Sequence, residues 1–130
     1  MSALLDTNVL IRHLTGIPRD QARRATAFLA GAEQLRLVDL VVAETVYVLR
    51  SVYDAPRDQI AALLRAVITY PSVVVDDVGM LLRTLALYQV ERLDFADAYL
   101  VAVAESTGIG AVASFDRTID RVGTVTRIEP

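Results

Sequence analysis

The chain lacks several residue types on which common catalytic sites depend. It has no Cys, no Trp and no Lys, so all thirteen basic residues are Arg, and its only His is His13. Without Cys there is no disulfide, thiolate nucleophile or cysteine zinc site. Without Lys, a Schiff-base enzyme and a P-loop are excluded. A single His gives little support for a Ser-His-Asp triad, and the absence of Trp gives little for a base-stacking platform.

Signals for membranes, disorder and basic surfaces are also lacking. Gly and Pro are sparse, the hydrophobic content is 54%, and no apolar run is long enough to cross a bilayer. The amino-terminal segment resembles no signal peptide. The net charge of −3 argues against a generic basic nucleic-acid binder. The arginines either reflect a GC-rich genome or include some that grip phosphates. We expect one cytoplasmic domain over residues 1–130, with no membrane association.

Short apolar segments alternate along the chain with segments of helical periodicity. Strands are predicted over residues 3–5, 35–38, 72–75, 111–114 and 125–128. Helices are predicted over residues 9–14, 19–31, 41–53, 57–69, 78–90 and from Asp94 to a stop at Gly108. In the helix over 19–31, Ala22, Ala25, Phe28 and Leu29 recur at helical spacing. This alternation predicts an α/β fold with a mainly parallel central sheet of four to five short strands flanked by helices.

Four acidic residues stand in apolar surroundings at wide spacing. They are Asp6, Glu44, Asp97 and Asp116. Burying a lone carboxylate costs several kcal/mol, so each needs an explanation. All four are predicted at strand ends or in the first turns of helices, and ligands of open parallel sheets bind beyond the carboxyl ends of the strands. We therefore expect the fold to gather them into one pocket that holds divalent metal ions.

Each acid also has a purely structural explanation. Asp6 caps a helix in that case, and Asp116 is an ordinary turn residue. Asp94 and Asp97 are spaced as an N-cap and its N3 partner; capping is favoured for Asp94 and the metal site for Asp97. Glu44, within the apolar segment 41–49, is expected to point inward or into a cleft, in the first turn of the most buried helix. Its structural alternative is a buried Arg partner.

Carboxylate oxygens alone favour Mg²⁺ or Mn²⁺ over zinc or copper. Such ions bind substrate phosphates, and a pair of them activates water and stabilises the leaving oxygen of a phosphodiester. Bound metal would supply the positive charge that the protein as a whole lacks.

Together these segments resemble the PIN-domain ribonucleases, especially VapC-type toxins of prokaryotic toxin–antitoxin pairs. The match follows the family order over essentially the whole chain and rests on Leu5-Asp6-Thr7-Asn8-Val9-Leu10, the Glu44 helix, residues 93–100 and Ser114-Phe115-Asp116. The resemblance implies a Mg²⁺- or Mn²⁺-dependent endoribonuclease that forms a homodimer and is inhibited by a cognate antitoxin protein.

The resemblance also assigns roles to individual residues. Metal binding and catalysis fall to Asp6, Glu44, Asp97 and Asp116, with Asp94 as an extra acid near the pocket. Thr7, Asn8 and Ser114 occupy polar positions beside the metals, and Ser114 stands where Thr is common. Candidate phosphate contacts, chosen because each is close in sequence to a proposed ligand, are Arg12, Arg50 and Arg117.

Two rival functions follow from the same residues. One is a catalytically silent PIN-like module that binds a protein partner or RNA, which the presence of all four acids argues against. The other is an aspartyl-phosphate enzyme with Asp6 as nucleophile. Asn8 stands where such enzymes usually place a second Asp, and the required Lys is missing. Apolar faces over residues 41–53 and 57–69 belong either to the core or to a dimer or antitoxin surface.

Overall fold

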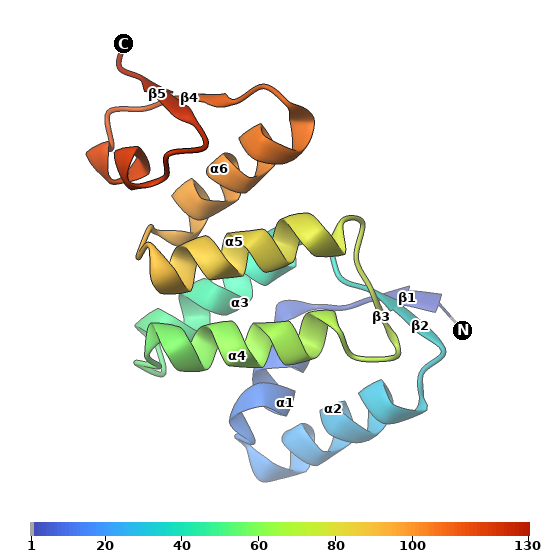
Figure 1. The fold of residues 1–130 in the computed structure, drawn as a ribbon. Helices are drawn as coiled ribbons and strands as arrows, with labels where there is room; N and C mark the ends of the chain where they lie inside the picture. The colour runs from blue at the N-terminus through green and yellow to red at the C-terminus, as the bar shows by residue number, and fades with distance from the viewer. Residues whose placement is uncertain (1) are drawn as a thin grey trace. The chain divides into compact units, whose positions relative to one another are not determined.

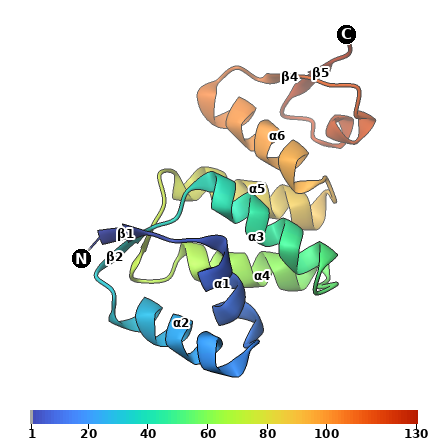
Figure 2. The same cartoon turned by 180° about the vertical axis from the view of Figure 1, so that it is seen from behind.

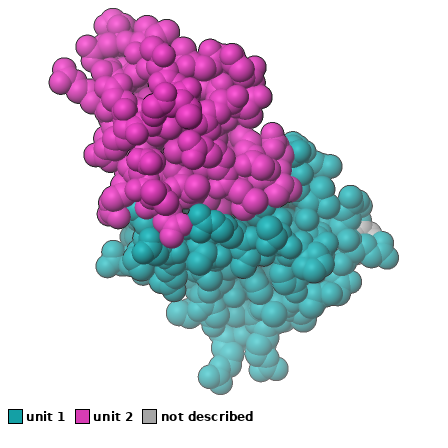
Figure 3. All heavy atoms as spheres, in the orientation of Figure 1, with its two compact units in different colours: residues 1–76 teal, residues 77–130 magenta. Residues whose placement is uncertain are grey.

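The computed structural model describes residues 2–130, which form two compact units (Figure 3). The first unit extends to Asp76 and the second comprises Asp77–Pro130. Figure 1 and the reverse view in Figure 2 label their helices and strands. Both units combine helices with short parallel strands, so the α/β class predicted from the sequence is confirmed.

The first unit is built around a three-stranded parallel sheet of order β1-β2-β3. Its strands are β1 (Ser2–Leu4), β2 (Gln34–Arg36) and β3 (Val73–Val74), with Leu35 paired to Ala3 on one side and Val73 on the other. Its helices are α1 (Thr7–Thr15), α2 (Arg19–Gly31), α3 (Asp39–Ser51) and α4 (Arg57–Ile68).

Local chemistry fixes the start and the end of α1. Asp6 is its N-cap, and the Asp6 carboxylate accepts a hydrogen bond of 2.7 Å from the Thr7 backbone N–H. Gly16 ends the helix with φ at 73°, a left-handed conformation that glycine adopts without a Cβ penalty. The apolar side of α1 places Leu10 in the core at 0% exposure. Asp6, one of the predicted metal ligands, therefore lies between the end of β1 and the start of α1.

The second unit consists of two packed helices followed by a two-stranded parallel sheet. Its elements are α5 (Val78–Val90), α6 (Phe95–Thr107), β4 (Ala111–Ala113), the 3₁₀ helix η1 (Arg117–Arg121) and β5 (Thr126–Ile128). Arg83 on α5 donates two hydrogen bonds, 2.8 and 2.9 Å, to the carboxylate of Glu105 on α6. This forked pair holds the two helices in register, because a bidentate contact fixes both distance and orientation.

Most predicted elements are found within two residues of their predicted bounds. The five strands are all present and all pair in parallel, but their pairings form two sheets, one in each unit, where the sequence predicted one central sheet. The 3₁₀ helix η1 was not predicted. It is only five residues long, too short for a periodic pattern.

The predicted burial of α3 is wrong in part. One face packs inward through Val42, Val46 and Leu49, whereas Leu40 is 77% exposed and Tyr47 is 70% exposed. Apolar sequence all round a helix does not fix its burial, since a helix buries only the faces that neighbours cover. Within residues 2–130, every helix is too short or too polar to cross a lipid bilayer.

Candidate metal site

Three aspartates of the second unit bring their carboxylates together. One carboxylate oxygen from each of Asp94, Asp97 and Asp116 lies within 4.8 Å of the other two. Asp94 is the N-cap residue of α6 and Asp97 lies in the first turn of that helix, while Asp116 is the N-cap of η1. We call this set the aspartate trio. It joins the start of α6 to the segment that follows β4.

The capping prediction for Asp94 is half right. Asp94 stands at the N-cap position, and its carbonyl oxygen accepts the first helical hydrogen bond, 2.8 Å from the Ala98 N–H. Its side chain, however, makes no capping hydrogen bond. The carboxylate contributes to the trio instead, so the residue assigned mainly to structure lies beside the one assigned to the site.

Hydrogen bonds from the following turn fix the Asp116 carboxylate. Its Oδ1 accepts hydrogen bonds from the Thr118 N–H at 2.9 Å and the Thr118 hydroxyl at 2.7 Å. The Ser114 hydroxyl oxygen in turn accepts one from the Asp116 N–H at 2.9 Å. The two Thr118 hydrogen bonds and a further one from Asp97 hold the pKa of Asp116 below its usual range, with the Thr118 side chain as the largest cause. Asp116 is therefore ionised and aimed before any ligand arrives.

Asp97 has the opposite electrostatic character. Burial, the hydrogen bond to Asp116 and the charges of Asp116 and Asp94 together raise its pKa to about 6, with burial as the largest cause. Two carboxylates that share one proton shift apart in this way, since the pair resists a second negative charge. A divalent cation would remove that penalty by replacing the proton.

Two arginines that the sequence analysis did not single out stabilise the segment around Asp116. Arg127 on β5 donates to the Ser114 carbonyl at 2.9 Å and to the Asp120 carboxylate on η1 at 3.0 Å. Arg121 donates to the Glu91 carbonyl oxygen at 3.1 Å, which ties η1 to the loop between α5 and α6. Arg121 lies five residues after Asp116, so closeness in sequence could have found it, whereas Arg127 lies eleven residues after Asp116. Only the parallel pairing of β4 with β5 brings Arg127 beside Ser114.

The remaining predicted ligands, Asp6 and Glu44, belong to the first unit. Asp6 is exposed at the N-cap of α1, where its carboxylate accepts the Thr7 N–H. Glu44 lies in the second turn of α3, because the helix begins at Asp39, and it is exposed. The expectation that Glu44 lies in a first turn and points into the core is wrong, and so is its alternative of a buried Arg partner, whereas a place in a cleft stays a prediction. Its neighbours at positions 40 and 47, on the same face, are exposed as well.

None of the four acids singled out from the sequence is buried. They stand at helix starts and strand ends or on an open helix face, where side chains reach beyond the apolar core. The desolvation penalty that made them conspicuous in the sequence is therefore largely avoided by the exposed Asp6 and Glu44, whereas partial burial remains the largest cause of the raised pKa of Asp97.

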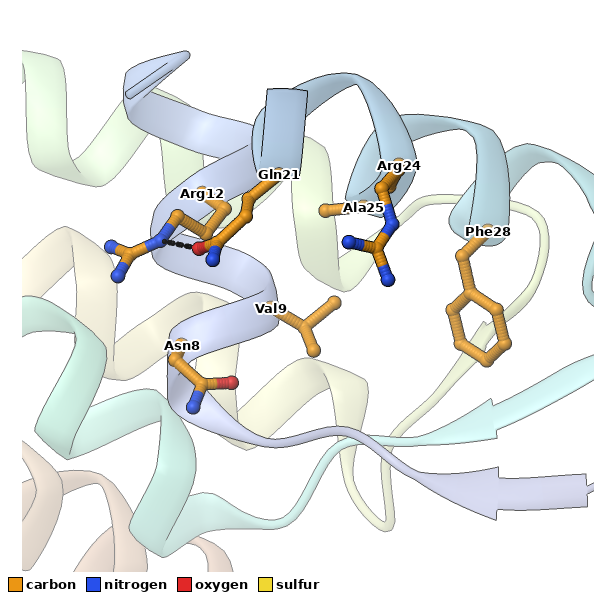
Figure 4. Close-up of a pocket in the computed structure, with 7 residues that line it drawn as sticks. All are labelled: Asn8, Val9, Arg12, Gln21, Arg24, Ala25 and Phe28. Atoms are coloured by element: carbon orange, nitrogen blue, oxygen red, sulfur yellow. Dashed lines mark hydrogen bonds between the residues drawn. The ribbon is translucent and has the colours of Figure 1, made fainter. Parts of the chain in front are cut away.

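The other predicted site residues are spread over both units. Thr7 is 6% exposed and opens α1, while Asn8 and Arg12 line a pocket between α1 and α2 (Figure 4). Arg50 is exposed near the end of α3, and Arg117 is exposed at the start of η1.

The aspartate trio fits a divalent cation that prefers oxygen. Oxygen ligands of Mg²⁺ lie about 2.1 Å from the ion, so two ligands of one ion are about 3.0 Å apart when adjacent and at most about 4.2 Å apart. One oxygen from each aspartate lies within 4.8 Å of the other two, so small side-chain rotations would bring all three to one ion. A set of carboxylates alone, with neither imidazole nor thiolate, suits Mg²⁺ or Mn²⁺ and not zinc.

Comparisons with known proteins place the chain in a family. No curated protein sequence matches it. The family model described as the PIN domain matches residues 3–125, a span that takes in both units and the aspartate trio. The chain therefore belongs to the PIN-domain family.

Proposed function

We propose that this protein is an endoribonuclease that depends on Mg²⁺ or Mn²⁺. The observation that carries the proposal is the aspartate trio, Asp94, Asp97 and Asp116, in a chain whose family consists generally of nucleases that use divalent metals. A module that only binds RNA or protein has no use for three clustered carboxylates, in which burial and the two neighbouring aspartates raise the pKa of Asp97.

The three aspartates have different proposed roles in binding the metal. Asp116, ionised and fixed by Thr118, provides the permanent negative ligand. Asp97, whose pKa is raised to about 6, would hold the cation as a carboxylate, so a bound ion would displace its proton only below about that pH. Asp94 adds a third oxygen from the start of α6. When bound, divalent metal supplies an activated water and charge stabilisation for the phosphodiester.

The proposal extends to two acids of the first unit. Asp6 and Glu44 act with the trio, as the PIN-domain resemblance of their sequence segments implies. The support for this part is the sequence pattern and the exposure of both carboxylates, which leaves them accessible to a ligand.

The test is an RNA cleavage assay with the purified full chain. We expect cleavage of RNA within the strand in Mg²⁺ or Mn²⁺, no cleavage in EDTA, and recovery when the metal is returned in excess. Cleavage that continues unchanged in EDTA contradicts the metal dependence. No cleavage under any metal condition, by a protein shown to be folded, favours the silent module.

We further propose that the protein is the toxin of a toxin–antitoxin pair and forms a homodimer. The sequence resemblance supports the toxin role. The exposed apolar residues Leu40 and Tyr47 on one face of α3 supply an interface for a second copy or an antitoxin. Expression in a bacterial host should arrest growth, and the product of an adjoining gene should relieve it. Growth unaffected by a cleavage-active protein contradicts the toxin role, and light scattering reports the oligomeric state.

A further inference from the structure

A pocket of about 660 Å³ lies in the first unit between α1 and α2. Figure 4 shows the side chains that line it, which lie about one turn apart along each of the two helices. The lining residues are Asn8, Val9, Arg12, Gln21, Arg24, Ala25 and Phe28. A volume in the range of about 300–1,000 Å³ accepts a drug-sized ligand. The pocket therefore has room for a whole nucleotide and not only for an inorganic anion.

The chemistry of the lining favours an anion. Two of the lining residues are arginines and none is acidic, although the chain as a whole has more acids than arginines. The Nε of Arg12 donates a 2.7 Å hydrogen bond to the Gln21 side chain, which orients the guanidinium and leaves its two terminal nitrogens available. Across residues 2–130 the Arg24 guanidinium has neither an ion pair nor a hydrogen bond. Arginine forks without a carboxylate partner match phosphate geometry.

An aromatic ring borders the same pocket. Phe28 lies one turn after Arg24 on α2, and Figure 4 shows both side chains projecting in the same general direction from that helix. The sequence periodicity grouped Phe28 with the core, but its side chain is 45% exposed. Phe28 also borders a second hollow, lined in part by Ala3 and Leu35. An exposed ring of this kind provides a face on which a nucleic-acid base stacks.

We propose that this pocket binds one nucleotide of a single-stranded RNA, with the phosphate held by Arg12 and Arg24 and the base stacked on Phe28. The inference rests on the proposed ribonuclease function and adds the place on the first unit where one unpaired nucleotide of the substrate is held. Bases in a duplex are already stacked on their neighbours, so only an unpaired base can reach Phe28. Asn8, in the first turn of α1, places the pocket two residues from Asp6 in the chain.

The test is RNA binding measured in EDTA, where the proposed metal-dependent cleavage is off. The probe is a short fluorescein-labelled single-stranded RNA followed by fluorescence anisotropy, with the same sequence as a duplex for comparison. The variants are Arg24→Gln and Phe28→Leu. Arg23→Gln is the matched control, because Arg23 is a neighbouring exposed arginine that does not line the pocket. Thermal melts confirm that each variant is folded.

Phe28→Leu should weaken binding about five- to hundredfold, the range measured for loss of base stacking on an aromatic side chain. Arg24→Gln should weaken binding and reduce the slope of log affinity against log salt by about 0.7, the value for one phosphate contact on a single strand. Arg23→Gln should bind as the wild type does, and the duplex should bind more weakly than the single strand.

Four results would contradict the proposal that the pocket binds RNA. They are no RNA binding by the wild type in EDTA, equal losses in Arg23→Gln and Arg24→Gln, unchanged binding by both pocket variants, or equal affinity for the duplex. Failure of the proposed function has a different signature, in which RNA binds through the pocket but metal produces no cleavage. Conversely, metal-dependent cleavage with an unchanged KM in both pocket variants overturns the pocket and leaves the ribonuclease standing.

Discussion

The two compact units of this chain differ in charge. Residues 1–76 contain eight acidic residues and eight arginines, whereas residues 77–130 contain eight acidic residues and five arginines. The whole net charge of −3 therefore resides in the second unit. Arginines without acidic neighbours line a pocket in the first unit, while carboxylates without a cation cluster in the second.

This difference shows why net charge is a poor guide to nucleic-acid binding here. A slightly acidic chain looks unsuited to RNA, yet the excess of acids lies in the second unit, while the first unit is neutral and has two arginines in the lining of one pocket. Bound metal offsets the carboxylates locally, and two arginines suffice to hold a phosphate. The following experiments either separate the roles of the two units further or show that the contrast has no functional meaning.

Removing a carboxylate from the trio should have the largest effect. Asp97→Asn and Asp116→Asn should each reduce RNA cleavage about a thousandfold, because metal stabilises the reacting phosphate by several kcal/mol. Cleavage rates at saturating Mn²⁺ measure this loss. Glu91→Gln, an acid of the same unit outside the trio, should cleave at the wild-type rate. A wild-type rate for Asp97→Asn would remove the trio from the mechanism.

The same assay applied to Asp6→Asn and Glu44→Gln examines the first unit. If these carboxylates complete the site, both variants should lose about as much cleavage activity as Asp97→Asn and Asp116→Asn do. Normal cleavage by either variant would exclude that residue from the ligand set and confine the metal chemistry to the second unit.

The next largest effect concerns the arginine that supports the trio. Arg127→Met should lower the free energy of unfolding, because it leaves the Ser114 carbonyl and the Asp120 carboxylate without their donor. The Arg127 side chain is only 11% exposed, so water replaces those bonds poorly. Urea denaturation measures the change. Arg117 is exposed nearby, and Arg117→Gln should change the free energy of unfolding by less than about 0.5 kcal/mol. Equal losses of stability in Arg127→Met and Arg117→Gln would show that the contacts of Arg127 do not stabilise the fold.

Metal binding by the second unit should also depend on pH. The metal must displace the proton from Asp97, whose pKa is about 6. Mn²⁺ affinity should therefore be about tenfold weaker at pH 5 than at pH 7, since about one molecule in ten has the carboxylate ionised at pH 5. Calorimetric titrations at several pH values test this. Asp97→Asn should bind more weakly at every pH, with a flatter profile, and an unchanged profile in that variant would assign the proton elsewhere.

The sequence was informative about elements and less so about burial. Caps and breakers placed α1, α2, α5 and α6 closely, since Asp6, Gly16 and Gly108 act within one turn of the chain. Exposure depends on neighbours distant in sequence, and no local pattern contains that information. For this reason Phe28 and Glu44 were assigned to covered positions that the structure leaves open.

The residues of the candidate site show the same difference between local signals, which the sequence contains, and contacts between residues distant in sequence, which it does not. Asp97 and Asp116 were singled out correctly as acids that the fold holds near each other, and Asp94 was underrated because its local role as a cap explained it well enough. Thr118 could have been found, since a Thr two residues after an Asp commonly closes a turn of this kind. Arg127 could not, because its place beside Ser114 depends on the pairing of β4 with β5.

The smallest expected effect is on the stability of the metal-free protein. The pKa of Asp97 is raised in the folded state above its ordinary value of 3.8, so its contribution to stability is fully present below about pH 4. That contribution is lost as the pH rises through about 6. Because Asp97 is only partly buried and solvent screens its neighbours, the loss should be about 1 kcal/mol or less.

Asp97→Asn removes the titrating group and keeps the shape of the side chain. In EDTA at pH 7.5 the variant should therefore melt a few degrees above the wild type, while at pH 4 the two should coincide. Added Mn²⁺ should raise the melting temperature of the wild type past that of the variant, because only the complete trio binds the ion tightly. A variant less stable than the wild type at pH 7.5 without metal would mean that Asp97 serves the fold. The second unit would then carry its excess of acids for structure, and the contrast with the arginine pocket of the first would lose its functional meaning.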